Sequence, residues 1–150
     1  MNAREMQIAS LLERGVYVID MLPDQVPAAD AARYFAAEAY WMQSGTDAVF
    51  RGKLSALLIR LSCYYSVQML KNGESAGEFT PAALAGLLRE FRPQDMLHLL
   101  LDGGASLLMY DGSDLYASVY APDETMQRRL GQLAAAEGLF FRPGASDISG

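Results

Sequence analysis

The residue types best suited to acid–base or nucleophilic chemistry are scarce in this chain of 150 residues. It contains one histidine, His98, and one cysteine, Cys63. A metal site with two histidine ligands is therefore impossible, and a Ser-His-Asp or Cys-His unit would have to use His98 itself. The apolar run around His98, MLHLLL, is typical of a half-buried position. Cys63 lies within an apolar segment, where a free thiol is usually a small buried hydrophobe.

Phosphate-binding and calcium-binding patterns are also missing from the sequence. Neither G-x-G-x-x-G nor G-x-x-x-x-G-K-[ST] occurs, so no nucleotide cofactor is expected. The acidic segment 111–114 lacks the twelve-residue ligand series of an EF-hand and is better explained as a hairpin turn. We therefore expect no metal, no cofactor and no catalytic residue.

Two features could instead form a binding site. Asp20 ends an apolar run and precedes the proline-containing segment LPDQVP, so its carboxylate either caps a turn, which we favour, or faces a cleft. Aromatic residues are dense between positions 34 and 65, and they either belong to the core or form an interaction surface beside charged neighbours, because Trp, Tyr and Arg dominate binding hot spots. The candidate binding residues are Asp20, Tyr34, Glu38, Trp41, Arg60 and Tyr64.

The element expected to organise the fold is one long, largely buried helix over residues 46–73. Its apolar residues recur at intervals of three and four, the period of a helix face. Thr46 is a suitable N-cap, and Lys71-Asn72-Gly73 is a good stop signal. The preceding alanine-rich segment, 27–45, is expected to form a second helix that packs antiparallel to the first.

The remaining chain predicts both helices and strands. Short helices are expected at 3–14 and 80–91, and an early strand at 16–21. Residues 95–101 fit either a helix or a strand, and we favour the helix. After residue 104 the pattern predicts a hairpin of strands 105–110 and 115–120, a helix that Ala121-Pro122-Asp123-Glu124 opens and Glu137-Gly138 closes, and a strand at 139–142.

These elements predict an α+β fold in a single domain. Helices should pack against a small, mainly antiparallel sheet that includes a C-terminal β-β-α-β unit. The globular domain is expected over residues 1–143, followed by a flexible polar tail at 144–150. Hydrophobic residues make up 51% of the chain and charged residues 20%, a composition typical of a folded protein.

Charge and hydropathy limit the function classes. The net charge of −6, with scattered basic residues, argues against a nucleic-acid binder. No run reaches the roughly 18 apolar residues of a membrane span, and no signal-peptide core precedes residue 15, so we expect a cytoplasmic protein with no membrane partner. The single cysteine fits a reducing compartment.

Three functions agree with these limits. The first, which we favour, is a non-enzymatic protein-interaction or regulatory module of the inhibitor or immunity type, acting on a more basic protein. The second is a small-molecule-binding protein or small enzyme with an aromatic pocket that uses Asp20, Glu38 or Arg60. The third is self-association as a homodimer that buries surplus apolar surface.

Overall fold

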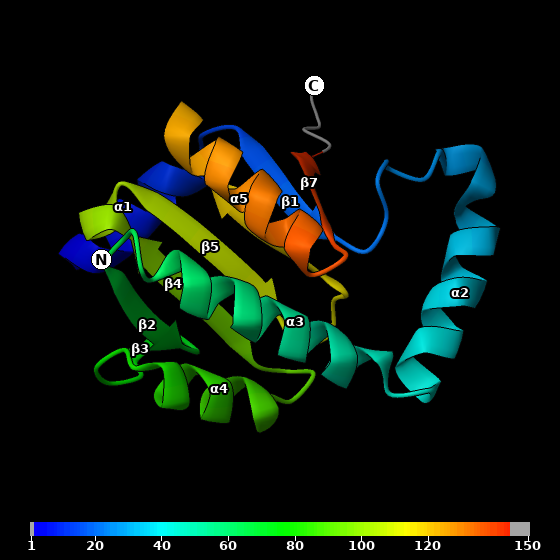
Figure 1. The fold of residues 1–150 in the computed structure, drawn as a ribbon, viewed down its shortest axis with the longest axis horizontal. Coiled ribbons are helices and arrows are strands. Elements are labelled where there is room, and N and C mark those ends of the chain that lie inside the picture. Colours follow the sequence, from blue (N-terminus) through cyan, green and yellow to red (C-terminus); the bar gives the residue numbers. More distant parts are fainter. Residues whose placement is uncertain (1, 145–150) are drawn as a thin grey trace.

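An antiparallel sheet of seven strands lies at the centre of the computed structural model, which describes residues 2–144 (Figure 1). The spatial order is β3-β2-β4-β5-β6-β1-β7. Strand β1, the first in the chain, therefore lies between β6 and β7, the last two. The strand bounds are β1 Val16–Asp20, β2 Val67–Lys71, β3 Glu74–Ser75, β4 Met96–Leu101, β5 Ser106–Asp111, β6 Tyr116–Tyr120 and β7 Phe140–Pro143.

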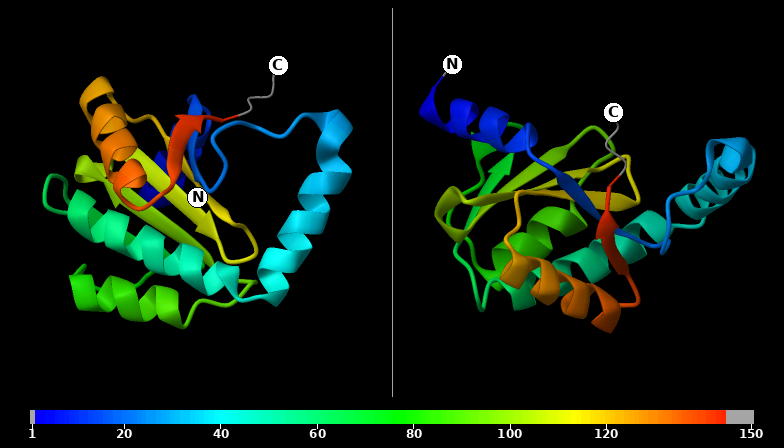
Figure 2. Two further views of the ribbon diagram at one scale, coloured as in Figure 1. Left: turned by 45° about the vertical axis from the view of Figure 1, so that its right-hand side comes forward. Right: turned by 90° about the horizontal axis from the view of Figure 1, so that it is seen from above.

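Three helices cover one face of this sheet and enclose the main core (Figure 2). They are α3 Thr46–Leu61, α4 Pro81–Arg89 and α5 Glu124–Ala136. Alternate strand residues point into this core, because side chains in a strand project to opposite faces. The largest buried side chains of α3 and of the strands meet there: Phe50, Leu54, Leu57, Leu58, Leu61, Met69, Leu99, Leu108 and Tyr110.

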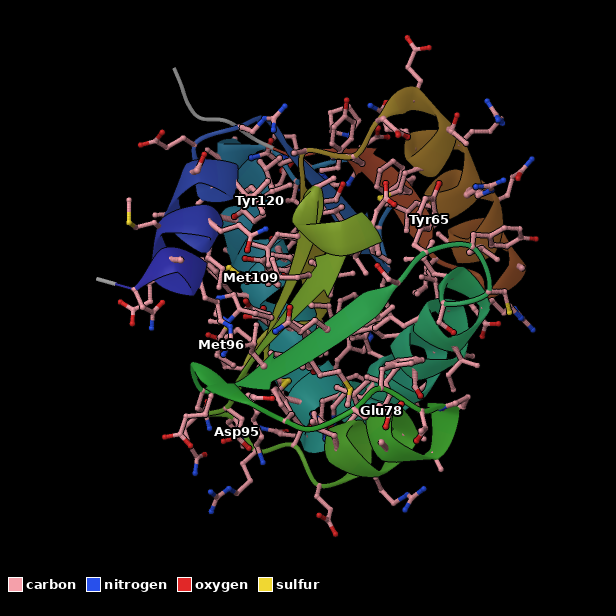
Figure 3. All side chains as sticks on the ribbon, turned by 90° about the vertical axis from the view of Figure 1, so that its left-hand side faces the viewer. Tyr65, Glu78, Asp95, Met96, Met109 and Tyr120 are labelled. Atoms are coloured by element: carbon pink, nitrogen blue, oxygen red, sulfur yellow. The ribbon has the colours of Figure 1, made fainter. Side chains whose placement is uncertain are left out.

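The opposite side of the sheet, here called the outer face, is covered only in part. Helix α1, Ala3–Leu12, begins at the side-chain cap Asn2 and packs Leu11 against Leu70, Leu100 and Leu107. Tyr120, Met109 and Met96 follow one another down the side on which α1 lies (Figure 3). Beyond α1, the residues of β1 and β6 that point outward are half-buried rather than buried.

Helix α2, Ala31–Gln43, stands apart from the rest of the protein (Figures 1 and 2). The segment after β1 leads to it through a short 3-10 turn, Ala28–Asp30. Gly45, with φ of +81°, then turns the chain sharply into α3. The expected antiparallel packing of these two helices is wrong: α2 and α3 meet at this turn and then diverge, and no residue of α2 is buried.

The expected helix over residues 46–73 is correct only in its first part. Helix α3 ends at Leu61, and Ser62 closes it by donating a side-chain hydrogen bond to the carbonyl oxygen of Ile59 (2.6 Å). After a turn, residues 67–71 form β2, which pairs with β4. Residues 46–73 resembled a single helix because a buried helix face and a buried strand are both apolar. Hydrophobic periodicity alone does not show where the helix ends and the strand begins.

Residues 95–101 also differ from the favoured interpretation, because Met96–Leu101 forms strand β4 rather than a helix. This strand lies inside the sheet, between β2 and β5. Its inward side meets the main core and its outward residue Leu100 contacts the α1 cluster. Apolar side chains are therefore needed on both faces, which removes the alternation typical of a strand. A second short 3-10 turn, Asp102–Gly104, leads into β5.

The expected fold class and the C-terminal unit are confirmed. The chain is an α+β protein in one compact domain, and β5, β6, α5 and β7 form the C-terminal β-β-α-β unit. Helix α4 begins at the N-cap Thr80 with proline at its first position, as its sequence indicates. Apart from Gly144, the predicted tail at 144–150 lies outside the described residues. Among the described helices, none is long and apolar enough to cross a membrane.

Candidate functional site

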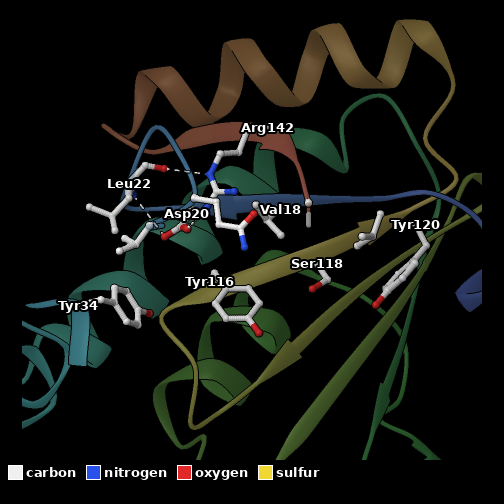
Figure 4. A pocket seen from close by; sticks show the side chains of 12 residues that line it. Val18, Asp20, Leu22, Tyr34, Tyr116, Ser118, Tyr120 and Arg142 are labelled. Carbon is white, nitrogen blue, oxygen red and sulfur yellow. Dashed lines mark hydrogen bonds and ion pairs between the residues drawn. The ribbon is translucent and has the colours of Figure 1, made fainter. Parts of the chain in front are cut away.

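A hollow of the outer face lies where β6, β1 and β7 meet the N-terminal part of α2 (Figure 4). Its volume is about 400 Å³, within the range of small-ligand sites. Tyr34 and Tyr116 lie toward one end, Tyr120 lies toward the other, and Ser118 lies between the last two. The other lining residues are Val16, Val18, Asp20, Leu22, Gln25, Val26, Arg142 and Gly144. We call this hollow the outer-face pocket.

An ion pair between Asp20 and Arg142 forms one wall of the outer-face pocket. Neighbouring strands bring the two side chains together, and Nη2 of Arg142 lies 2.5 Å from a carboxylate oxygen of Asp20. The other oxygen of Asp20 accepts hydrogen bonds from the backbone N–H groups of Met21 (2.6 Å) and Leu22 (3.3 Å). Asp20 therefore caps the turn after β1 and also lines a cleft, so both roles considered for it occur together.

Helix α2 contributes Tyr34 to the pocket lining, and Glu38 lies beside Tyr34 but does not line the pocket. The two residues lie one helical turn apart, and the Tyr34 hydroxyl donates a hydrogen bond to Glu38 (3.0 Å). Burial and this acceptor raise the pKa of Tyr34 above its usual value. Burial, followed by the charge of Asp114, likewise raises the pKa of Tyr116. These phenols therefore stay protonated and are hydrogen-bond donors rather than bases at neutral pH.

Uncompensated negative charge gathers beside this end of the pocket. Asp114 lies in the turn that precedes β6, and its charge acts on the phenol of Tyr116. Burial, then the charges of Asp111 and Glu38, raises the pKa of Asp114 to about 6. Within residues 2–144, none of these three carboxylates has a cationic partner within ion-pair distance.

The other three predicted binding residues lie away from the pocket. Trp41 packs against the main core from the end of α2 near α3. Arg60 forms an ion pair with Glu137 at the end of α5 (2.5 Å). Tyr64 is 58% exposed, and Arg129 of α5 stacks over its ring, with the guanidinium carbon 4.3 Å from the ring centroid. Arg60 and Tyr64 thus join α3 to α5.

Sequence reasoning missed four residues of this region: Arg142, Tyr116, Tyr120 and Asp114. The period-2 pattern of the predicted strand 115–120 placed Tyr116, Ser118 and Tyr120 on one face, so that signal was present. Nothing in the sequence showed that this face would meet Asp20, because that requires the position of β1 between β6 and β7.

A second surface of interest is the side of α2 that points away from the pocket. Phe35 is 62% exposed and Tyr40 is 68% exposed. Between them lie the exposed small residues Ala32, Ala36 and Ala39. The charged Arg33 lies at the edge of this side and reaches back toward Asp30, 3.6 Å away. We call this set the α2 outer side.

Neither His98 nor Cys63 is among the residues that line the outer-face pocket. Among residues 2–144, no group of three or more His, Cys, Asp or Glu side chains is placed to hold a metal ion. Cys63 is exposed after α3. On β4, His98 lies between Leu70 and Met109 of the adjacent strands. Its Nδ1 is buried without a hydrogen-bond partner among the described residues, and burial lowers its pKa.

No protein-family model matches this chain, and no curated protein or solved structure matches it either.

Proposed function

We propose that this protein is a non-enzymatic protein-interaction module and that α2 carries its principal contact surface. The observation that supports this proposal is that a helix of 13 residues rich in aromatic side chains buries none of them completely. Isolated helices of this length are marginal in water, and most gain stability from an apolar face packed against other elements. A partner on the α2 outer side would supply that packing.

The exposed aromatic area is large enough to matter for binding. Phe35 and Tyr40 together leave roughly 250 Å² accessible, taking about 200 Å² for each whole side chain. At about 25 cal/mol per Å², burying this area would contribute roughly 6 kcal/mol before the entropy of association is subtracted. Two such residues would be adequate hot spots for a partner that also contacts the surrounding alanines.

The test is affinity capture with the wild-type protein and with a Phe35→Ser/Tyr40→Ser variant. Because both side chains are exposed, the variant should keep its fold and unfolding midpoint. We expect a stoichiometric protein partner to be recovered with the wild type and lost with this variant. The matched control is Met6→Ser/Leu12→Ser, which removes two exposed apolar side chains from α1. Equal recovery by all three proteins would contradict the use of α2.

The first alternative partner for the α2 outer side is a second copy of the same protein. A second copy could pack its own α2 outer side against this one in a symmetric pair. Light scattering at two concentrations distinguishes this case, because a homodimer has twice the monomer mass and Phe35→Ser/Tyr40→Ser would return it to a monomer.

A second candidate function is small-molecule binding, which the volume of the outer-face pocket favours. A variant that fills the pocket, Ser118→Trp, should then abolish any metabolite-induced rise in melting temperature. The small-enzyme form of this alternative loses support, because Arg60 pairs with Glu137 at the end of α5 and does not line the pocket.

We place this module in the cytoplasm. The only cysteine is a free, exposed thiol, which fits a reducing compartment. Fractionation of cells that express the tagged protein tests this location.

A further inference from the structure

We propose that the outer-face pocket accepts a basic side chain, lysine or arginine, from the partner protein. This inference rests on the proposed protein-interaction function. It assigns a ligand chemistry to the outer-face pocket, which lies beside the N-terminal part of α2. Three properties of the pocket support it: the sign of the surrounding charge, the chemistry of the walls, and the pairing of the cation already present.

The charge near the pocket is negative and lacks an internal counterion. Glu38, Asp111 and Asp114 have no cationic partner among residues 2–144. They are also close enough together that the charges of Asp111 and Glu38 oppose ionisation of Asp114. An incoming ammonium or guanidinium group would reduce this repulsion. Its attraction would be strengthened because Asp114 is half-buried and therefore only partly screened by water.

The walls match the two parts of a basic side chain. Val16, Val18 and Val26 provide apolar surface for an alkyl stem. Tyr34 and Tyr116 provide aromatic rings toward one end of the pocket (Figure 4). The charged group would lie at this end, because Glu38 bonds to Tyr34 and the charge of Asp114 acts on Tyr116. Cations are attracted to the faces of such rings. The same chain already shows this preference elsewhere, because Arg129 stacks over Tyr64 and Tyr65.

Arg142, the cation within the pocket, does not make the pocket a site for an anionic ligand. Arg142 is the only cationic side chain among the described lining residues, and its guanidinium is paired with Asp20 at 2.5 Å. Its Nε also donates a hydrogen bond to the carbonyl oxygen of Leu22 (3.4 Å). With Arg142 neutralised by Asp20, the neighbouring acidic groups determine the net sign of the site.

The test is an NMR titration of the ¹⁵N-labelled full chain with four capped amino acids. N-acetyl-lysine and N-acetyl-arginine methylamides are the cationic probes, and the norleucine and glutamate analogues are the neutral and anionic ones. We expect saturable shifts of backbone amides in β6 and β1 with the two cationic probes only. Raising the salt concentration should weaken this binding.

Variants test the source of the affinity. Asp114→Asn and Glu38→Gln should each weaken binding of the lysine probe about three- to ten-fold, the range expected for partly exposed charge and cation–π contacts. Ser118→Trp, which fills the pocket, should abolish the binding. Glu78→Gln removes the same charge from an exposed residue outside the pocket and should leave the affinity unchanged.

Several results would overturn the inference. These are equal binding of the norleucine probe, preferred binding of the glutamate probe, or unchanged affinity in both acidic-site variants. Binding of free spermidine without binding of the lysine probe would also do so, because the occupant would then not be a peptide side chain. Failure of the proposed function has a different signature. Tyr40→Ser alone removes an exposed ring of the α2 outer side that does not line the pocket, so it weakens partner binding and leaves the titration of the pocket intact. Phe35 is left in place for this comparison because its ring packs against Tyr34.

Discussion

Replacement of Asp114 by asparagine should stabilise this protein at neutral pH. The substitution keeps the size of the side chain and removes a charge that the fold holds in an unfavourable position. Burial, then the charges of Asp111 and Glu38, raises the pKa of Asp114 from 3.8 to about 6. The folded state therefore binds a proton more tightly than the unfolded state does, and the fold loses stability as the pH rises from about 4 to about 6.

The size of the effect follows from this difference in pKa. At 1.36 kcal/mol per pH unit, the difference corresponds to about 3 kcal/mol. Asp114 is only half-buried, so solvent screening reduces the contribution, and we expect about 1.5 kcal/mol. The gain in Asp114→Asn should be fully present at pH 7.5, should shrink as the pH falls from 6 toward 3.8, and should vanish below about pH 3, where the wild-type carboxyl is protonated in both states.

The assay is urea unfolding of the wild type and the variant at pH 7.5, 6.0 and 4.5. Glu78→Gln controls for the change in net charge, because it also removes one acidic group but from an exposed position. The reasoning would be refuted by a variant that is destabilised at pH 7.5, or by a stabilisation that is constant over the three pH values. A stabilisation equal to that of Glu78→Gln would show that net charge alone is responsible.

Three further predictions concern the rest of the fold. Leu58→Ala should lower the free energy of unfolding by about 2–5 kcal/mol in urea denaturation, because Leu58 is buried in the main core. Burial lowers the pKa of His98, so the unfolded state binds the proton more tightly and the wild type should lose stability as the pH falls below 6.5. His98→Leu should remove this loss. Parallel curves of unfolding free energy against pH for the two proteins would contradict this. Gly112→Ala should lower the free energy of unfolding by about 2 kcal/mol or more, because a Cβ atom there would lie 2.0 Å from the carbonyl oxygen of Arg92. An unchanged midpoint of urea unfolding would show that this turn can move.

The local sequence pattern predicted most of the helices and strands that can be recognised from one apolar face or from a neighbouring turn. The hairpin around residues 111–114 was recognisable because turn residues separate two β-type runs. The same patterns failed at 62–73 and 95–101. Strands β2 and β4 lie inside the sheet, and which apolar run joins a sheet depends on partners distant in the chain. Leu70 pairs with His98, for example, and His98 with Met109.

The candidate site was predicted in part for a similar reason. Asp20, Tyr34 and Glu38 come together because the chain leads directly from β1 into α2. Arg60 and Tyr64 were grouped with them on the assumption that α2 packs along α3. Helix α3 has 16 residues and is therefore about 24 Å long. Helix α2 meets only the N-terminal end of α3, so Arg60, near the C-terminal end, lies about that length from the contact with α2.

The position of β1 between β6 and β7 has a consequence for the synthesis of the protein. Residue 20 leaves the ribosome long before its partners at 116–120 and 140–143 exist. At about 5–20 residues per second, the intervening chain takes roughly 5–20 seconds to translate. Throughout that interval β1 has neither of its neighbouring strands, so the native sheet cannot be completed until β7 has emerged. The pair Asp20–Arg142 can form only when β7 has emerged, which makes the outer-face pocket one of the last parts of the molecule to acquire its structure.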